Sequence, residues 1–163
     1  MKIEIIQHNR QYEQETIDLI VGIQAGEFGL PITAGDQPDL RKVDTFYQQG
    51  KGNFWIAVHK GRVAGSIALI DIGNNETALR KMFVHPDYRG KEKGVAQKLM
   101  DELFSWCRQQ GVQNIYLGTV EQFKASHRFY EKNGFRATDK LHLPVTFPAM
   151  PLDTIFYTYT FDK

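Results

Sequence analysis

Cysteine is almost absent from this sequence, because Cys107 is the only one among 163 residues. A single thiol excludes an intramolecular disulfide and fits a reducing compartment. No apolar run approaches the roughly 18 residues that a membrane span needs, so we expect no membrane partner. The opening residues, MKIEIIQHNR, lack the pattern of a signal peptide. Together these absences predict a cytoplasmic protein.

An excess of one charge is also missing, since 20 basic residues are balanced by 19 acidic ones, for a net charge of +1. Nucleic-acid-binding domains carry a basic surface, so we expect no nucleic-acid partner. The 5 histidines show no paired spacing of the kind that zinc ligands have, so we expect no metal. Any bound anion must therefore be held by a local group of residues.

The apolar pattern predicts one α/β domain over residues 1–163. Helices are expected at residues 11–24, 40–47, 94–110 and 121–133, and strands at residues 3–6, 54–59, 62–71, 76–85, 114–120 and 154–161. The longest helix has two apolar rows, one through Leu99 and Leu103 and the other through Met100 and Phe104. A stripe this wide needs a sheet to cover it.

The stretch HPDYRGKEKGVA leads from a strand into this longest helix and gathers basic residues around two glycines. The first turn of a helix has backbone N–H groups without carbonyl partners, and the helix dipole adds about half a positive charge there. This arrangement predicts a site for a diphosphate over Lys91–Ala96. The alternative is a solvated basic loop that binds nothing.

In this context the stretch resembles the main signature of the GCN5-related N-acetyltransferase (GNAT) superfamily, Gln/Arg-x-x-Gly-x-Gly/Ala. The family places it between a strand ending in Val-x-Pro and a long helix, and this chain has VHP followed by KEKGVA. Lys91 occupies the first signature position, and Gly94 and Ala96 occupy the two small ones. A second stretch, SHRFYEKNGF, is similar to the family's Ala-x-x-Leu/Phe-Tyr-x-x-x-Gly-Phe, with Tyr130 in register.

The resemblance implies the GNAT fold, an α/β (α+β) domain whose mixed, mostly antiparallel sheet has about six or seven strands and about four flanking helices. It also implies an acetyl-CoA-dependent N-acetyltransferase, with acetyl-CoA as co-substrate. The acetyl group would move to a primary amine of a small molecule or peptide by direct attack in a ternary complex. A non-catalytic acyl-CoA-binding sensor or docking module is the alternative function.

The resemblance also assigns residues to the cofactor. The backbone of the strand at 76–85, where it splays from the next strand, would pair with the pantetheine arm, and the helix entry would hold the diphosphate. The implied cofactor-binding residues are Met82, Phe83, Val84, Arg89, Gly90, Lys91, Lys93, Gly94, Val95, Ala96 and Tyr130.

Acetyl transfer requires a proton donor for the leaving thiolate and a way to deprotonate the amine. Tyr130 is the expected acid, because the resemblance places it beside the sulfur and a phenol can donate its proton. Glu76 is the expected base, acting through water, and Asp71 is its rival. The simpler interpretation of Glu76 and Asp71 is that each is a solvated carboxylate at a turn. Cys107 lies on an apolar helix row and reads as a core thiol.

The acceptor is expected near the loops AGEFGLPITAGD and LPVTFPAMPLD, where Phe28, Phe147 and Met150 would line an apolar pocket. The final strand, TIFYTYTF, alternates apolar residues with threonines, as antiparallel strands do. We expect it to be exposed and able to pair with the same strand of a second copy, which would give a homodimer.

Overall fold

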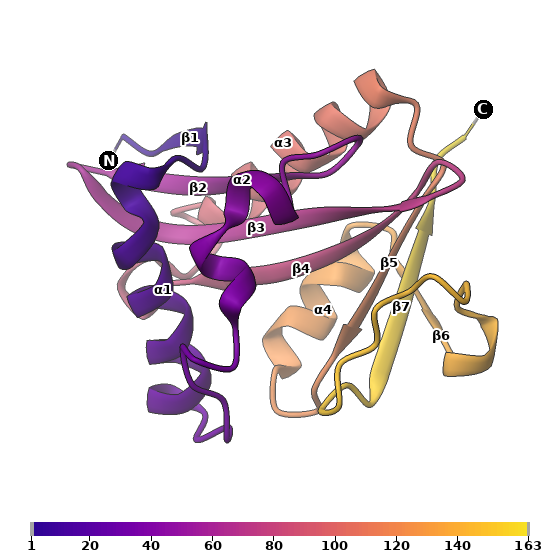
Figure 1. The fold of residues 1–163 in the computed structure, drawn as a ribbon. Coiled ribbons are helices and arrows are strands. Elements are labelled where there is room, and N and C mark those ends of the chain that lie inside the picture. The colour runs from indigo at the N-terminus through magenta and orange to yellow at the C-terminus, as the bar shows by residue number, and fades with distance from the viewer. Residues whose placement is uncertain (1, 163) are drawn as a thin grey trace.

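The computed structural model describes residues 2–162 as one seven-stranded sheet with helices on both faces (Figure 1). The strands follow the order β1-β2-β3-β4-β5-β7-β6, and the pair β4–β5 is parallel whereas the other neighbours are antiparallel. The predicted fold class is confirmed. The strand bounds are β1 (Glu4–Gln7), β2 (Asn53–His59), β3 (Arg62–Gly73), β4 (Glu76–Val84), β5 (Asn114–Thr119), β6 (Arg136–Thr138) and β7 (Ile155–Thr160).

The four α-helices divide between the two faces, and each face has its own hydrophobic core. Residues of α1 and α2 pack on one face, and residues of α3 and α4 pack on the other. The helix bounds are α1 (Glu13–Val21), continued by the π-helical η2 (Gly22–Glu27), then α2 (Val43–Phe46), α3 (Val95–Gln110) and α4 (Lys124–Lys132). Within residues 2–162, no helix combines the length and apolar composition that crossing a membrane requires.

The helix predicted at residues 40–47 is shorter than expected. Lys42 has φ −142° and ψ 48°, which is outside the helical region, so the segment divides into a 3-10 turn (Pro38–Arg41) and the single turn of α2. The other 3-10 turns are η1 (Arg10–Tyr12), η4 (Pro86–Tyr88) and η5 (Lys140–His142).

The prediction for α3 is confirmed, including its two apolar rows. Leu99, Met100, Leu103 and Cys107 are fully buried against the sheet. Burying each of the two leucines contributes about 1.5–3 kcal/mol relative to leaving it in water. Glycines in the left-handed conformation cap both ends of this helix, so its start and its end are fixed by sequence.

Strands β4 and β5 separate soon after they begin. Their pairing covers only Glu76–Ala78 of β4, and from Leu79 onward β4 is bonded to β3 alone. A bulge lies in the separated part of β4, where Lys81 and Met82 together oppose one residue of β3. Lys81 has φ 57°, a left-handed conformation that a lysine adopts only at a cost of about 1–3 kcal/mol. The hydroxyl of Ser66 donates to the Lys81 carbonyl (2.7 Å) and holds the bulge in place.

The last strand corrects the expectation of a free edge. β7 lies between β5 and β6 and is hydrogen-bonded on both sides, as Tyr157 illustrates by pairing with Leu117 and with Ala137. An added strand from a second copy has no free edge of β7 to pair with. The outer strand β6 was not predicted, because three residues are too few to show an alternating pattern.

Candidate active site

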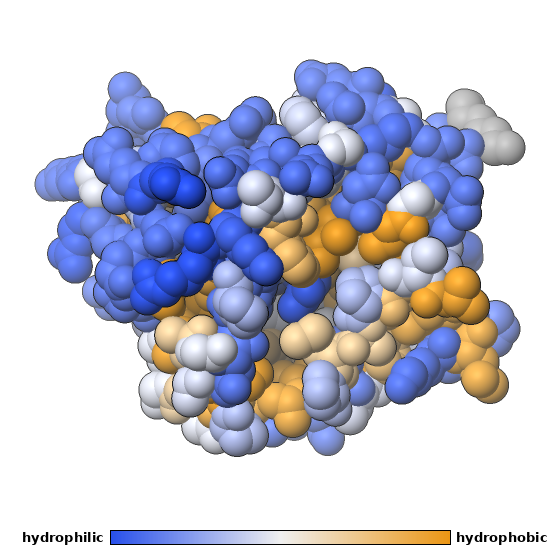
Figure 2. Space-filling model, viewed as in Figure 1, coloured by the Kyte–Doolittle hydropathy of each residue, from blue (hydrophilic) through white to orange (hydrophobic). Residues whose placement is uncertain are grey.

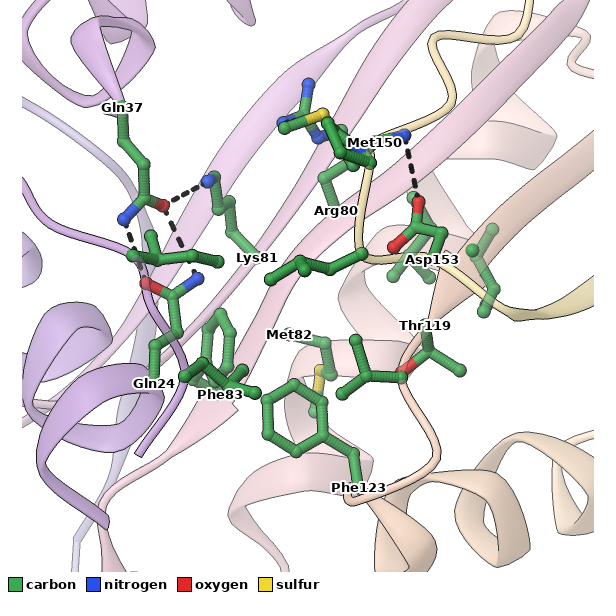
Figure 3. Close-up of a pocket in the computed structure, with 18 of the residues that line it drawn as sticks. Gln24, Gln37, Arg80, Lys81, Met82, Phe83, Thr119, Phe123, Met150 and Asp153 are labelled. Atoms are coloured by element: carbon green, nitrogen blue, oxygen red, sulfur yellow. Dashed lines mark hydrogen bonds between the residues drawn. The ribbon is translucent and has the colours of Figure 1, made fainter. Parts of the chain in front are cut away.

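A pocket of about 460 Å³ occupies the opening between β4 and β5 (Figure 3). Both loops expected around the acceptor contribute to its wall, through residues 30–37 and 147–153. Phe147 and Met150 line it as predicted, whereas Phe28 is not among the lining residues. On this face of the molecule, apolar residues gather over the opening and beneath it, beside a mostly hydrophilic upper surface (Figure 2).

Three aromatic side chains from separate elements meet at one side of the pocket. Phe123, which precedes α4, lies edge-on to Phe28 at 4.8 Å between ring centroids and to Phe83 of β4 at 5.9 Å. Phe123 and Phe83 line the pocket, and the contact with Phe28 connects them to the end of η2. These rings form an apolar boundary on this side of the pocket.

Tyr130 of α4 lies in the pocket wall, with 5% of its surface exposed. The rings of Phe135 and Tyr157 pack around it, at 5.6 Å and 5.9 Å between centroids. Within residues 2–162 no side chain or backbone group accepts from or donates to its hydroxyl. Burial raises the pKa of this hydroxyl well above its usual value, so the group stays protonated. The pocket thus contains a neutral O–H group that is available as a donor.

The two carboxylates expected as bases lie elsewhere. Glu76 precedes Leu79, the first pocket residue of β4, by three positions, or about 10 Å along an extended strand. Its carboxylate accepts a hydrogen bond from the hydroxyl of Tyr116 (2.7 Å). Asp71 accepts from the backbone N–H groups of Lys51 (2.9 Å) and Gly73 (2.8 Å). Both carboxylates therefore lie outside the pocket, where they accept hydrogen bonds that hold a turn or a strand end in place.

Asp153 is the carboxylate that lines the pocket beside β5, and no motif or spacing in the sequence distinguishes it from other acidic residues. A Cβ atom at Gly118 would approach Asp153 Oδ2 to 2.5 Å, so only glycine at position 118 accommodates this carboxylate. The backbone N–H of Met150 donates to Oδ2 (3.2 Å). Burial raises the pKa of Asp153, which brings the group closer to the proton-exchanging range near neutral pH.

The bulge in β4 brings two adjacent cations to the same pocket. Successive side chains of a regular strand point to opposite faces, but Arg80 and Lys81 both line the wall. Lys81 is nearly buried, with 6% of its side chain exposed, and its ammonium lies 3.7 Å from Asp39. It also donates to Gln37 Oε1 (2.5 Å). Tyr47 donates to the same Asp39 carboxylate (2.5 Å), so Lys81 is neutralised by a buried network.

Burial lowers the pKa of Lys81 from its ordinary 10.5 to about 8 in the folded protein. The unfolded chain therefore binds more protons between these two values, and stability rises with pH through that window. From about pH 7.5 to about pH 9, we expect the free energy of unfolding to rise by about 1 kcal/mol relative to Lys81→Met. Urea denaturation at the two pH values measures this difference. Lys98→Met, at an exposed lysine of α3, is the control and should show the same pH dependence of unfolding free energy as the wild type. If Lys81→Met also shows the wild-type pH dependence, Lys81 is not the group responsible.

The entry to α3 has the predicted unpaired amides. The first helical bond runs from Lys98 N–H to Gly94 O (3.0 Å), which leaves the N–H groups of the three intervening residues without a helical acceptor. A Cβ atom at Gly94 would meet only Lys91 O, at 3.8 Å, so the space in front of these amides is open. Lys91 lowers the pKa of the Lys132 ammonium by charge repulsion, which places two cations close together beside this helix end.

The other basic residues of the loop face the protein. Arg89 forms a paired contact with both carboxylate oxygens of Glu27 (2.7 Å each) and donates through Nε to Val84 O (2.9 Å). Lys93 donates to the carbonyl of Asp87 (2.6 Å). Gly90, with φ 115°, shapes the turn, and its carbonyl accepts from the N–H groups of residues 93 and 94. The structure thus brings Lys91, and not Arg89 or Lys93, to the open side of the helix entry.

Cys107 is fully buried in the core under α3. Burial raises the pKa of its thiol to about 12, so the reactive thiolate is not formed near neutral pH. Its interpretation as a core thiol is confirmed. Among residues 2–162, no three His, Cys, Asp or Glu side chains are grouped so that they could hold a metal ion.

A mixed sheet that opens between its two parallel strands, with free amides at the entry of α3 and a tyrosine on α4, is the arrangement that the resemblance to acetyltransferases implies. The chain belongs to the acetyltransferase (GNAT) family, because that family's model matches residues 23–135. The predicted superfamily is confirmed.

Solved and curated relatives agree with this assignment. An acetyltransferase of the GNAT family from Staphylococcus aureus Mu50 is 38% identical, with a TM-score of 0.93 over 98% of this chain and 99% of the other. The PaiA N-acetyltransferase from Thermoplasma acidophilum, solved with coenzyme A, is 19% identical with a TM-score of 0.73 over 99% of this chain and 100% of the other, and it shows the shared fold. N-acetylaspartate synthetase from Danio rerio is 31% identical over 124 residues, which are 73% of this chain but only 43% of that relative.

Proposed function

We propose that this protein is an acetyl-CoA-dependent N-acetyltransferase that acetylates a small amine by direct attack in a ternary complex. The observation that carries the proposal is the unpartnered Tyr130 hydroxyl in the wall of a pocket at the β4–β5 opening. If Tyr130 served only to pack the core, its position in a pocket wall would have no purpose. The name of the Danio rerio relative, N-acetylaspartate synthetase, adds amino acids to the acceptors that deserve testing.

The residues present fit coenzyme A. Unpaired amides at the α3 entry, with open space in front of Gly94, are suited to a diphosphate. Lys91 and Lys132 supply two nearby cations for its phosphates. Met82 and Phe83 line the pocket on the part of β4 that is not bonded to β5, so the free strand edge can pair with the pantetheine amides. When bound, acetyl-CoA supplies the acetyl thioester.

Tyr130 acts at the leaving group in this mechanism. Its O–H donates to the sulfur as the carbon–sulfur bond breaks, so that the thiolate leaves as a thiol. The amine nitrogen forms the new bond to the acetyl carbon and loses its protons to acceptors in the pocket and then to water. Cys107 takes no part, because its thiol is buried and protonated. A covalent acetyl-cysteine step is therefore not needed.

The test is amine-dependent release of coenzyme A, measured with a thiol reagent such as DTNB and confirmed by mass spectrometry of the acetylated product. Amino acids, polyamines, aminoglycosides and peptides form the panel. We expect thiol release with at least one class, against a low background, because the protein's own thiol is buried. Calorimetric binding of coenzyme A without thiol release across the panel would instead favour the acyl-CoA sensor.

A further inference from the structure

The charged groups of the pocket lie on two different walls. Arg80 and Lys81 come from β4, and Asp153 comes from the segment that packs against β5. In Figure 3 Lys81 points toward Gln37 on one side of the pocket, and Asp153 lies on the other side with apolar residues between them. Among the described residues Arg80 and Asp153 form no ion pair within 4.0 Å, and their charges interact only at longer range.

We propose that the acceptor is a small amine that also carries a carboxylate, with Arg80 binding that carboxylate and Asp153 receiving the amine. This inference rests on the N-acetyltransferase function proposed above, and it names the substrate class of the same pocket. It follows from a guanidinium and a carboxylate that both line this pocket, each in contact with Met150 and with no ion-pair partner among residues 2–162.

Arg80 lacks the partner that a guanidinium normally has. Its one hydrogen bond to protein within residues 2–162 goes to the thioether sulfur of Met150 (3.3 Å), which is a weak acceptor. By comparison, Arg89 is paired with Glu27 and Arg41 with Glu13. A guanidinium presents its donors in a planar fork that matches a carboxylate, so an acidic ligand would complete the site.

Lys81 is not the main receptor for an anionic ligand, because its ammonium already has partners within the protein. Asp39 and Gln37 occupy its ammonium from within the protein, and both are buried. Its charge still lies close enough to Arg80 for charge repulsion to contribute, after burial, to the lowered pKa of Lys81. A carboxylate bound at Arg80 would relieve that repulsion, which adds to the preference for an acidic acceptor.

Asp153 is suited to the amine end. The backbone N–H of Met150 is its hydrogen-bond donor within residues 2–162, so carboxylate lone pairs remain for a ligand. The second acidic residue of the wall, Asp36, is instead occupied by the N–H and hydroxyl of Thr33 (3.0 Å each). Burial raises the pKa of Asp153, which makes its carboxylate a stronger base toward an ammonium group.

The protons and bonds balance in this arrangement. The ammonium gives one proton to an Asp153 oxygen, which passes it to water, and the neutral nitrogen bonds to the acetyl carbon. The carbon–sulfur bond breaks, and Tyr130 gives its proton to the sulfur. The second proton lost from the nitrogen restores the Tyr130 hydroxyl through water. The net products are the amide, the thiol and one released proton.

The test compares each L-amino acid with its carboxamide as acceptor, in the wild type, Arg80→Gln and Asp153→Asn. For the best acceptor we expect the acid to exceed its amide by roughly 10- to 100-fold in kcat/KM, which is the contribution of a charged hydrogen-bonded pair. Arg80→Gln should remove this preference by raising KM for the acid alone. Asp153→Asn should lower kcat for acid and amide alike. Arg136→Gln, at an exposed arginine of β6, is the matched control and should keep the preference.

A polyamine or another amine without a carboxylate as the best acceptor would overturn the inference while leaving the proposed function intact. So would equal losses for acid and amide in Arg80→Gln. If no amine releases thiol although coenzyme A binds, the proposed function fails. The acceptor class is then decided by calorimetry on the coenzyme A-bound protein, where the acid must bind more tightly than its amide and lose that advantage in Arg80→Gln.

Discussion

Replacing Tyr130 with phenylalanine is expected to lower kcat by about 10²- to 10⁴-fold, the range that a positioned general acid contributes. The hydroxyl acts on the departing sulfur, so affinity for acetyl-CoA should change little and kcat and kcat/KM should fall together. The free energy of unfolding should stay within about 0.5 kcal/mol of the wild type, because this hydroxyl has no hydrogen-bond partner among residues 2–162 to lose. Steady-state kinetics, calorimetry with coenzyme A and urea denaturation measure the three quantities.

Tyr157 provides the matched control for this substitution. Its ring packs 5.9 Å from that of Tyr130, but its hydroxyl donates to Glu131 (2.7 Å), and the residue does not line the pocket. Tyr157→Phe should therefore retain near-normal turnover. Equal loss of activity in the two variants would show that packing of the aromatic cluster matters and that the acid assignment is wrong.

Gly94→Val is expected to weaken coenzyme A binding by about two orders of magnitude or more, since its side chain would occupy the space in front of the unpaired α3 amides. A Cβ atom there meets no protein atom closer than Lys91 O at 3.8 Å, so the fold can accept it. The left-handed φ of 65° adds a backbone cost of about 1–2 kcal/mol. Isothermal titration gives the affinity, and thermal unfolding gives the stability.

A substitution at Gly111 separates the effect of backbone strain from the effect of blocking the α3 amides. Gly111 caps the other end of α3 with φ 73°, and a Cβ atom there would meet only Lys51 Nζ, at 3.9 Å. Gly111→Val thus imposes the same backbone strain far from the predicted diphosphate site. We expect a similar loss of stability and normal coenzyme A affinity. If both variants lose affinity equally, the helix entry does not hold the diphosphate.

Much of the sheet and the longest helix could be predicted from the sequence. Helix α3 has an apolar stripe of helical period over sixteen residues and a glycine at each end, so its type and bounds were readable. The entry of α3 is open and Tyr130 lies beside a pocket, and the roles that the two motifs predict for them are tested by the variants above. These features depend on local patterns, which a sequence displays directly.

The charged half of the pocket could not be predicted, because it depends on backbone geometry and on distant packing. Lysine disfavours the left-handed conformation, yet Lys81 has φ 57°. The residue types at positions 80–82 therefore do not predict the bulge. Asp153 reaches the pocket only because Gly118, on another strand, leaves room for it. Glu76 is suggested by the family resemblance, which places a glutamate early in this strand, but the extended strand carries the pocket residues away from it.

The wall formed by residues 147–153 differs from the rest of the pocket in its backbone hydrogen bonds. Its backbone bonds are local, such as Asp153 N–H to Met150 O and Phe147 N–H to Pro144 O, and the segment lies beyond residues 23–135 that the family model matches. Exchanging this stretch for that of another acetyltransferase would therefore disturb few ladder bonds and leave the α3 entry untouched. Because Asp153, the proposed partner of the amine, lies on this wall, changes here would alter how the amine is held while Arg80 and the α3 entry stay the same.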